Sequence, residues 1–314
     1  CIVEVGLGGR FDATNVLEGP AACGIAALGI DHERFLLAPE DGTPEDPLTR
    51  IAFEKAGITK PGCSLVTQSY AQGPTLEIER AAARNGAPLA MRGREWSASL
   101  SQTALHYADR HGELTLLLPA MPGAHQAENA ALAVAMLRHQ DFVSVSSDAI
   151  AEGIRGAKWP ARLQRFSEGK LGEIDRGFEF WLDGGHNVGA ARAIRQAIEA
   201  DPAVKRQIPE GRGINIILGM LANKDAEGFI AEIAPVARKL VAVPVPGHDH
   251  HPLASLEEMA RKAGIETVCQ ADDVIGALDL LNTGRPDDEW KPIAILGSLY
   301  LAGEVLRLNG TLPV

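Results

Sequence analysis

The amino-acid sequence predicts an α/β fold divided into two domains, and three observations support this. Continuous apolar runs, as over residues 1–5 and 23–30, are typical of strands buried on both faces of a sheet. Helical patterns separate successive runs, and the order strand, helix, strand favours parallel pairing. A segment with Gly and Pro, residues 156–165, breaks the pattern near the middle of the chain. We therefore expect one domain over residues 1–157 and another over 158–314.

A parallel sheet is expected at the start of the first domain. Strands are predicted over residues 1–5, 23–30 and 64–68, because these runs lack the alternation of a half-exposed sheet. A short helix is predicted between residues 47 and 57 and a longer one over residues 75–86. Each ends at a glycine, which is the residue that best fits a helix C-terminus.

The second half of this domain changes pattern. Short alternating segments over residues 97–100, 104–108 and 113–118 are separated by polar turns, which indicates an antiparallel hairpin. An Ala- and Leu-rich segment over residues 124–140 has the composition of a long helix.

The second domain is expected to be a smaller, doubly wound, Rossmann-like α/β unit. Apolar strand patterns alternate there with helical ones. Its predicted strands cover residues 178–183, 213–219, 240–245, 266–270 and 292–297, and its predicted helices cover residues 190–200, 226–237, 255–263, 272–282 and 300–308.

The composition excludes several classes of protein. The 314 residues carry a formal net charge of -11, which opposes a nucleic-acid partner because such surfaces need clustered Lys and Arg. The chain has four cysteines without a CxxC pair, so neither a disulfide framework nor a zinc site is implied. No apolar run reaches the ~20 residues that span a bilayer, and we expect no signal peptide. We expect a cytoplasmic protein without a membrane partner.

A glycine-rich motif follows the first predicted strand. The segment EVGLGGRFDATN, residues 4–15, lets the backbone turn tightly and approach a ligand. It is not a dinucleotide fingerprint, because Phe11 occupies the position of the third glycine. Its Glu4, Arg10 and Asp12 favour a polar site at the carboxyl end of a strand, where open α/β sheets bind ligands.

Two further segments carry chemistry. In LGIDHERF, Asp31 and His32 follow a buried strand, and one carboxylate with one imidazole can hold a divalent cation such as Mg²⁺. In IAFEKAGITKPG, Lys55 lies in a mostly apolar helical turn. It is either a surface lysine that snorkels or a partly buried amine with a lowered pKa, which can add CO₂ to form a metal-binding carbamate.

The strings EVGLGGRFDATN, GIDH and EKAGITKPG, in this order, resemble those of the folylpolyglutamate synthase/dihydrofolate synthase family of the Mur ligase superfamily. PGAHQAENAALA, PARLQ, LDGGHN and GSLYLAGEV extend the resemblance over essentially the whole chain. It implies a Mur-ligase-type central ATPase domain followed by a C-terminal α/β domain. It also implies an ATP-dependent amide ligase, acting as a monomer, that joins L-glutamate to a folate or dihydropteroate carboxylate through an acyl phosphate.

The resemblance also implies roles for individual residues. Glu4 and His32 match magnesium ligands, and Lys55 matches a lysine that family members carry as a carbamate, which would bind a second Mg²⁺. The catalytic residues are expected to be Lys55, His32 and Arg162. The residues expected beside the pterin are Phe11, Asp12 and Ala13, and those expected at ATP are Asn129, Arg162, Asp183 and His186.

The sequence departs from the family pattern in four places. Gly185 and Val188 replace the common Ala and Pro after Asp183, and the acidic segment over residues 39–47 is longer than usual. The histidine-rich loop over residues 247–251 is interpreted as solvated rather than as a metal site. The family's GTNGKGS-type phosphate-binding loop does not occur, so we expect an N-terminally truncated chain without ligase activity of its own.

Two alternatives stay open. One is another Mur-type ligase, which joins amino acids to a UDP-sugar, although EVGLGGRFDATN argues against it. The other is a non-catalytic remnant that binds nucleotide or folate. The sequence does not distinguish dihydrofolate synthase from folylpolyglutamate synthase activity, and it does not identify glutamate-binding residues.

Overall fold

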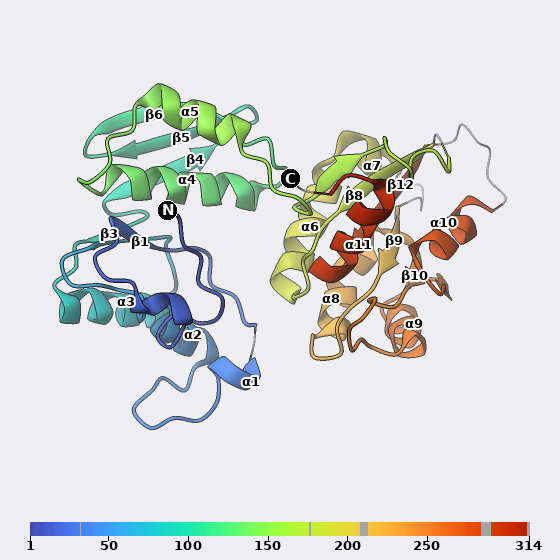
Figure 1. Ribbon diagram of the computed structural model, residues 1–314, viewed down its shortest axis with the longest axis horizontal. Coiled ribbons are helices and arrows are strands. Elements are labelled where there is room, and N and C mark those ends of the chain that lie inside the picture. Colours follow the sequence, from blue (N-terminus) through green and yellow to red (C-terminus); the bar gives the residue numbers. More distant parts are fainter. Residues whose placement is uncertain (32, 176, 208–212, 284–289, 313–314) are drawn as a thin grey trace. The chain divides into compact units, whose positions relative to one another are not determined.

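The computed structural model describes residues 1–31, 33–175, 177–207, 213–283 and 290–312. The chain divides into two compact units (Figure 1). The N-terminal unit comprises Cys1–Ala120 and His125–Ala157, and the C-terminal unit comprises Met121–Ala124 and Lys158–Val314. Within the described residues, no helix combines the length and apolar character that a bilayer crossing requires.

The N-terminal unit contains two three-stranded sheets. The parallel sheet has the order β1 (Ala22–Ile25), β2 (Ser64–Thr67) and β3 (Leu89–Met91). The antiparallel sheet contains β4 (Trp96–Leu100), β5 (Ala104–Asp109) and β6 (Gly112–Leu117). The predicted parallel sheet is therefore confirmed, and the three segments predicted as antiparallel correspond to β4, β5 and β6.

Helices cover both faces of the parallel sheet, because side chains alternate along its strands. Leu65 and Met91 join one apolar cluster with α2 (Pro47–Ala56) and α3 (Gln72–Asn85). Val66 and Ala90, the next positions along, join a second cluster with α4, α5 and the antiparallel sheet. The remaining helices of the unit are η1 (Ala13–Val16), α1 (Glu33–Leu36), α4 (Ala124–Arg138) and α5 (Ser147–Gly156).

Local sequence explains where α2 and α3 begin and end. Asp46 accepts a hydrogen bond from the Thr49 amide, and Pro47 fits the first turn, where its missing N–H costs nothing. Gly57 follows the last residue of α2, as predicted. Gly86 ends α3 in the left-handed region with φ 57°, which favours glycine.

The C-terminal unit is built on one doubly wound sheet. This sheet has more strands than either sheet of the N-terminal unit, whereas the sequence predicts the second domain to be the smaller one. Its order is β11-β10-β9-β12-β8-β7, with only β7 antiparallel. The strands are β7 (Gln164–Phe166), β8 (Phe178–Leu182), β9 (Ile214–Leu218), β10 (Ala237–Ala242), β11 (Thr267–Gln270) and β12 (Lys291–Leu296). The predicted Rossmann-like class is confirmed.

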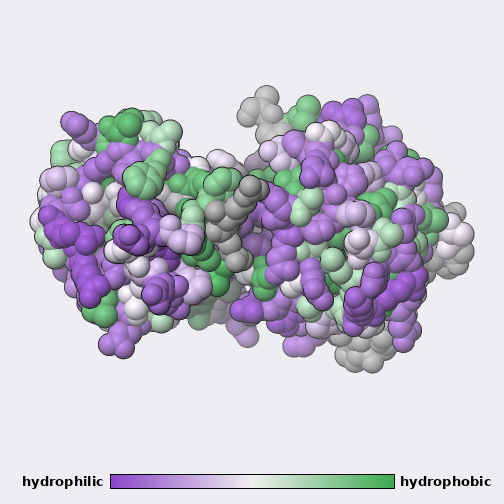
Figure 2. All heavy atoms as spheres, turned by 90° about the horizontal axis from the view of Figure 1, so that it is seen from below, coloured by the Kyte–Doolittle hydropathy of each residue, from purple (hydrophilic) through white to green (hydrophobic). Residues whose placement is uncertain are grey.

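Its two faces bury separate apolar clusters. Ile216 packs with α6, α8 and α9, whereas Ile217 packs with α10 and α11. The helices are α6 (Val188–Ala200), α7 (Pro202–Gln207), α8 (Ala226–Ile233), η3 (Ala234–Val236), α9 (Leu253–Lys262), α10 (Val274–Asn282) and α11 (Leu299–Asn309). On the face seen in Figure 2, hydrophilic residues predominate and apolar residues form separate patches.

One strand prediction is wrong and another is too long. Residues 1–5 form no strand; Ile2 is fully exposed and Val3 about half exposed. An apolar run does not supply a pairing partner, and none of the described strands pairs with this segment. The strand predicted over residues 23–30 ends at Ile25.

Candidate active site

The glycine-rich loop and the end of α2 form one structural unit. The Arg10 amide donates a 2.8 Å hydrogen bond to the Glu54 carbonyl. The Asn15 side-chain amide donates to the carbonyls of Arg10 (3.0 Å) and Gly57 (3.1 Å). A Cβ on Gly57 would lie 2.5 Å from the Arg10 Cα, so the contact requires glycine. The motifs EVGLGGRFDATN and EKAGI, separate in sequence, therefore pack against each other.

Four charged side chains hold this contact, and we call them the arginine–glutamate clamp: Arg10, Glu40, Arg50 and Glu54. Glu54 is buried and accepts from Arg10 (2.8 and 3.1 Å) and from Arg50 (3.0 Å). Glu40 accepts from Arg10 (2.5 and 2.9 Å) and from Arg50 (3.0 Å). Paired, hydrogen-bonded charges of this kind fix the geometry of the segments that carry them.

The acidic segment over residues 39–47 has a structural role that the sequence did not reveal. It carries Glu40, whose carboxylate accepts hydrogen bonds from Arg10 of the glycine-rich loop and from Arg50 of α2. Arg50 and Glu54 stand four residues apart on α2, the spacing at which helix side chains meet. That spacing was the available signal for the clamp.

Asp12 shapes the loop from within. Its carboxylate accepts from the Leu7 amide (2.8 Å), the Thr14 amide (2.9 Å) and the Thr14 hydroxyl (2.5 Å). These hydrogen bonds, that from the Thr14 hydroxyl above all, lower the pKa of Asp12 to about 2. Asp12 therefore stays ionised and caps η1, while Phe11 and Ala13 on either side are exposed.

Lys55 lies half-buried in the last turn of α2. Burial lowers the pKa of its amine, and the Asp31 carboxylate opposes this by favouring the charged form. The end of α2 and Asp31 are thus within electrostatic reach of each other. Glu4 is exposed and forms no hydrogen bond or ion pair within the described ranges. His32, the other predicted metal ligand, lies outside the described residues.

Asn129 is exposed on α4, and no hydrogen bond occupies its side-chain amide in the part of the chain that the structure describes. Its neighbours anchor the helix: the Glu128 carbonyl accepts from the Gln68 side chain (2.8 Å), and Gln126 is buried. Asn129 is therefore held on a fixed helix with its amide turned to solvent.

In the C-terminal unit, Asp183 holds the turn that presents Arg162. The Asp183 carboxylate follows β8 and accepts from the amides of Leu163 (2.8 Å) and Gly185 (2.7 Å). The Gly184 amide donates back to the Ala161 carbonyl (3.0 Å). Sequence reasoning placed Arg162 and Asp183 at the same ligand, and the structure joins their backbones.

The Arg162 turn is strained on both sides. Ala161 and Leu163 have φ values of 54° and 45°, in the left-handed region that costs a residue with a Cβ ~1–2 kcal/mol. Both are buried, which keeps the turn in place, whereas Arg162 between them is half-buried. Packing thus forces one arginine into a defined position, a pattern that is common at functional sites.

Further polar residues gather at the carboxyl edge of the six-stranded sheet. His186 Nδ1 lies 3.2 Å from the Gly184 carbonyl after β8, and Asn187 caps α6. Ser298 caps α11 directly after β12. The predicted residues Asp183 and His186 therefore stand at the edge where doubly wound sheets bind ligands.

The histidine-rich loop over residues 247–251 belongs to the same edge, and His248 is exposed, in agreement with a solvated loop. The loop also makes contacts: His251 Nε2 lies 2.8 Å from the Lys224 carbonyl, and the His248 ring stacks on Tyr300 with centroids 3.6 Å apart. Among the described residues, no cluster of three potential metal ligands occurs. These contacts have no signal in the sequence, because they join loops that follow different strands.

The predicted residues therefore fall into two groups. Glu4, Phe11, Asp12, Ala13, Lys55 and Asn129 lie in the N-terminal unit, and Arg162, Asp183 and His186 lie in the C-terminal unit. A parallel sheet with an antiparallel companion, followed by a doubly wound unit, agrees with the Mur-ligase type of fold that the motif resemblance implies.

Comparison with the sequences of known proteins shows which members of this fold class the chain is similar to. The chain is 31% identical over 309 residues to dihydrofolate synthase/folylpolyglutamate synthase of Escherichia coli, covering 98% of this chain and 64% of the relative. It is 28% identical over 319 residues to folylpolyglutamate synthase of Lacticaseibacillus casei, covering 97% and 65%. The chain is a homologue of the folylpolyglutamate synthase/dihydrofolate synthase family and spans a little under two thirds of these relatives. No protein-family model matches it.

Solved structures agree with this relationship. Escherichia coli FolC in complex with DHPP and ADP superposes with a TM-score of 0.78 at 27% identity, covering 97% of this chain and 64% of that one. Bifunctional folylpolyglutamate synthase/dihydrofolate synthase of Yersinia pestis, complexed with AMPPNP and Mn ion, superposes with a TM-score of 0.73 at 27% identity, covering 96% and 64%.

Proposed function

We propose that the protein is an ATP-dependent carboxylate–amine ligase that adds L-glutamate to a folate or dihydropteroate carboxylate. The γ-phosphoryl group of ATP passes to the carboxylate, which gives an acyl phosphate and ADP. The glutamate amine then attacks the carbonyl carbon, the amide forms and phosphate leaves. The observation that carries the proposal is the packing of the glycine-rich loop on the end of α2, which unites the two motifs most specific to this family.

In the C-terminal unit, Arg162 and Asp183 serve the nucleotide. A guanidinium has a planar fork of donors that fits phosphate oxygens, and its charge does not depend on pH. The strained turn fixes the position of Arg162, and Asp183 holds that turn through the Leu163 amide. Asp183 is therefore a positioning residue in this proposal, in addition to any contact that it makes with the nucleotide. His186 and the exposed Asn129 amide complete the proposed ATP residues.

In the N-terminal unit, the glycine-rich loop serves the pterin. Phe11 is 80% exposed, and the Arg10 guanidinium lies 4.2 Å from the centroid of its ring. An exposed aromatic face with a cation behind it is suited to stacking on a flat heterocycle. Asp12 and Ala13 follow Phe11 in the same loop, and the arginine–glutamate clamp joins that loop to α2.

The residues present fit a divalent cation in part. Glu4 and His32 would be oxygen and nitrogen ligands, and Lys55 would contribute oxygens as a carbamate. Addition of CO₂ to the neutral Lys55 amine forms the N–C bond and releases one proton, and the lowered pKa of this amine favours the step. A bound Mg²⁺ would supply charge stabilisation for the phosphoryl group.

An isotope experiment tests the reaction. The protein is expressed from its intact gene and incubated with Mg²⁺, ATP, L-glutamate and dihydropteroate or a reduced folate whose carboxylate carries ¹⁸O. We expect ADP formation that requires both the pterin and glutamate, and transfer of ¹⁸O from the carboxylate to inorganic phosphate. ADP formation without transfer of the label, or amino-acid transfer to a UDP-sugar instead, would contradict the proposal.

A further inference from the structure

A buried glutamine joins the parallel sheet of the N-terminal unit to α4. Gln68 comes directly after β2 and is only 6% exposed. Its Nε2 donates a 2.8 Å hydrogen bond to the carbonyl of Glu128 on α4, 60 residues further along the chain. Its Oε1 accepts from Arg92 Nη1 at 3.1 Å. Both ends of the side-chain amide are therefore in use, one on a helix and the other on an arginine.

The contact with α4 is made at the peptide bond that leads to Asn129. The Glu128 carbonyl belongs to the planar peptide unit that ends at the Cα atom of Asn129, so a hydrogen bond to this oxygen restricts where that Cα lies. A carbonyl oxygen has two lone pairs and can accept from Gln68 as well as within the helix. Gln68 therefore acts on the backbone of Asn129, whose exposed side-chain amide stays available to a ligand.

Arg92 holds the other end of the Gln68 amide. This arginine follows β3, and its backbone amide donates to the Thr67 carbonyl at the end of β2 (3.0 Å). Its Nη2 donates to the Ala98 carbonyl of β4 (2.9 Å), and its Nη1 lies 3.6 Å from the Glu128 carboxylate. One guanidinium thus contacts the glutamine, β4 and α4, which restricts the orientation of the glutamine amide.

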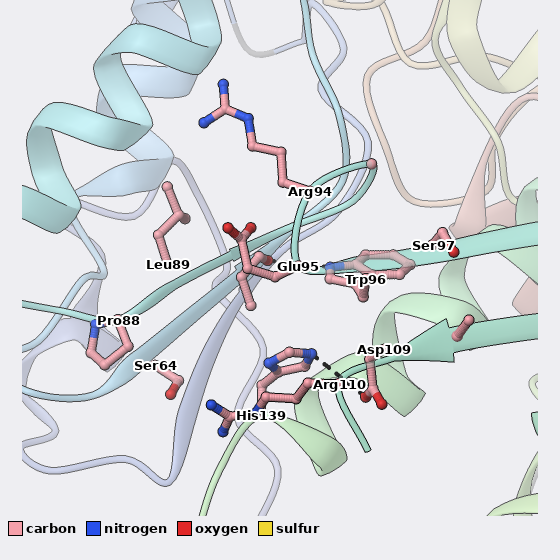
Figure 3. A pocket seen from close by; sticks show the side chains of 13 residues that line it. Ser64, Pro88, Leu89, Arg94, Glu95, Trp96, Ser97, Asp109, Arg110 and His139 are labelled. Atoms are coloured by element: carbon pink, nitrogen blue, oxygen red, sulfur yellow. Dashed lines mark hydrogen bonds and ion pairs between the residues drawn. The ribbon is translucent and has the colours of Figure 1, made fainter. Parts of the chain in front are cut away.

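The turn that carries Arg92 has hydrogen bonds of its own. Glu95 Oε2 accepts from the Met91 amide (2.8 Å), and the Gly93 amide donates to the Trp96 carbonyl (2.7 Å). Figure 3 shows Glu95 and Trp96 where this turn enters β4. The Trp96 ring is buried, and the Arg92 guanidinium lies 5.9 Å from its centroid. The glutamine is therefore braced by a turn whose own geometry is fixed.

The chemistry of Asn129 makes its exact position important. An asparagine amide presents one donor and one acceptor side by side, and adenine presents the complementary pair at its 6-amino group and N7. Hypoxanthine has an oxygen in place of the 6-amino group, so that edge carries two acceptors and the amide cannot make both hydrogen bonds. Hydrogen bonds weaken steeply when their angles depart from linear, so this discrimination depends on where the amide is held.

We propose that Gln68 is a positioning residue for adenine recognition. It holds the peptide unit between Glu128 and Asn129 so that the Asn129 amide meets the 6-amino edge of the base. The inference rests on the proposed function, in which Asn129 contacts ATP, and adds a residue that does not touch the nucleotide. Loss of the contact between Gln68 and α4 should therefore lower the preference for adenine and leave the contacts with the phosphates in place.

Calorimetric titration with ADP and with inosine diphosphate (IDP), which carries hypoxanthine, tests this on the protein expressed from its intact gene. Gln68→Glu keeps an oxygen for Arg92 but places a second oxygen against the Glu128 carbonyl, so it breaks only the contact with α4. We expect the wild type to bind ADP at least about tenfold more tightly than IDP, and Gln68→Glu to lose most of this preference. Gln68→Met, of similar size but without either hydrogen bond, should lose it too.

Tyr70→Phe is the matched control from the same turn. The Tyr70 hydroxyl hydrogen-bonds to the carbonyls of Ile25 (2.6 Å) and Ala26 (2.9 Å) and to the Gln68 amide (3.3 Å), and these partners lie outside α4. Its loss should destabilise the turn without a change in the ratio of ADP to IDP affinity. In an Asn129→Ala background, Gln68→Glu should not change that ratio further, because both residues act on one interaction.

The outcomes distinguish this inference from the proposed function. If Asn129→Ala lowers the preference for ADP but neither Gln68 variant does, the positioning role is overturned and the contact of Asn129 with ATP stands. Equal weakening of ADP and IDP in the Gln68 variants would show a structural role only and would also overturn it. If the wild type binds both nucleotides equally and Asn129→Ala changes nothing, the adenine contact of the proposed function fails, and this inference fails with it.

Discussion

At the scale of single residues, the surroundings of Lys55 change the chemistry of its side chain. Burial lowers the pKa of its amine, although Asp31 favours the charged form. The lowered pKa increases the neutral fraction that can add CO₂, because only the neutral amine has the electron pair for the new bond.

Substitution of Lys55 should therefore remove activity even when the charge is kept. We expect Lys55→Ala and Lys55→Arg, in the protein expressed from its intact gene, each to lower the rate of glutamate-dependent ADP formation at least ~100-fold, because neither supplies metal-binding oxygens. Added acetate should partly restore Lys55→Ala and leave Lys55→Arg unchanged, because only alanine leaves space for it. Near-normal activity of Lys55→Arg would exclude a carbamate.

Substitutions at Arg162 and Asp183 separate two effects: the loss of a contact with the nucleotide, and the loss of the hydrogen bonds that hold the turn carrying Arg162. Asp183→Asn replaces one acceptor oxygen by an N–H₂ group that faces a backbone donor, so we expect a loss of ~1–3 kcal/mol in the free energy of unfolding and weaker ADP binding. Arg162→Lys should weaken ADP binding without a change in stability, because no described residue depends on its fork. Urea unfolding and calorimetric titration measure the two effects. If Arg162→Lys binds ADP as tightly as the wild type, a positive charge at this position is sufficient for ADP binding and the planar guanidinium group is not required.

At the scale of elements, the contact between the glycine-rich loop and α2 depends on close backbone approach. Gly57 has a φ of -61°, which any residue adopts, but a Cβ there would meet Arg10 Cα and Cβ at 2.5 Å. We expect Gly57→Ala to lower the free energy of unfolding by ~1–3 kcal/mol through overpacking. Gly153→Ala is the control: Gly153 is exposed in α5 with open space around it, so alanine should stabilise the helix by ~0.5–1 kcal/mol. Chemical denaturation measures both, and equal effects would refute the packing argument.

Sequence patterns predicted the elements whose signals are local. The first turn at Pro47, the glycines after α2 and α3, and the apolar strands of the six-stranded sheet were all readable. The strand predicted over residues 1–5 was wrong, because hydrophobicity does not specify a pairing partner. The three-residue strands β3 and β7 and the short helix α7 were missed, because so few residues show no period.

For the candidate site, the sequence predicted individual residues that lie in motifs, but not the contacts that connect them. Motifs that resemble those of the family pointed to Arg162 and Asp183 separately. Their connection depends on the left-handed residues Ala161 and Leu163, which are not glycines and carry no sequence signal. Glu40 belongs to the arginine–glutamate clamp through contacts with residues 10 and 50, and such tertiary pairs cannot be deduced from spacing along one chain.

At the scale of the whole molecule, each unit has its own buried ion pair and its own apolar clusters. In the N-terminal unit, burial alone would raise the pKa of Asp109, but Arg138, the His111 amide and the Tyr107 hydroxyl lower it to about 2. In the C-terminal unit, Lys291 is fully buried and pairs with Asp175 and with Asn282 (2.8 Å). Removing one partner of such a pair leaves an uncompensated charge and typically costs ~3–5 kcal/mol.

Because each apolar cluster of the described residues is formed within one unit, we expect two unfolding transitions in calorimetry. Lys291→Met should lower the midpoint of one transition and Asp109→Asn that of the other. Since the folded pKa of Asp109 is below its unfolded value, its contribution of ~2 kcal/mol is present above pH ~4 and is lost as the pH falls toward 2. The difference between the wild type and Asp109→Asn should therefore shrink over that range, in the N-terminal transition only. A single transition that both substitutions shift equally would show that the two units unfold together.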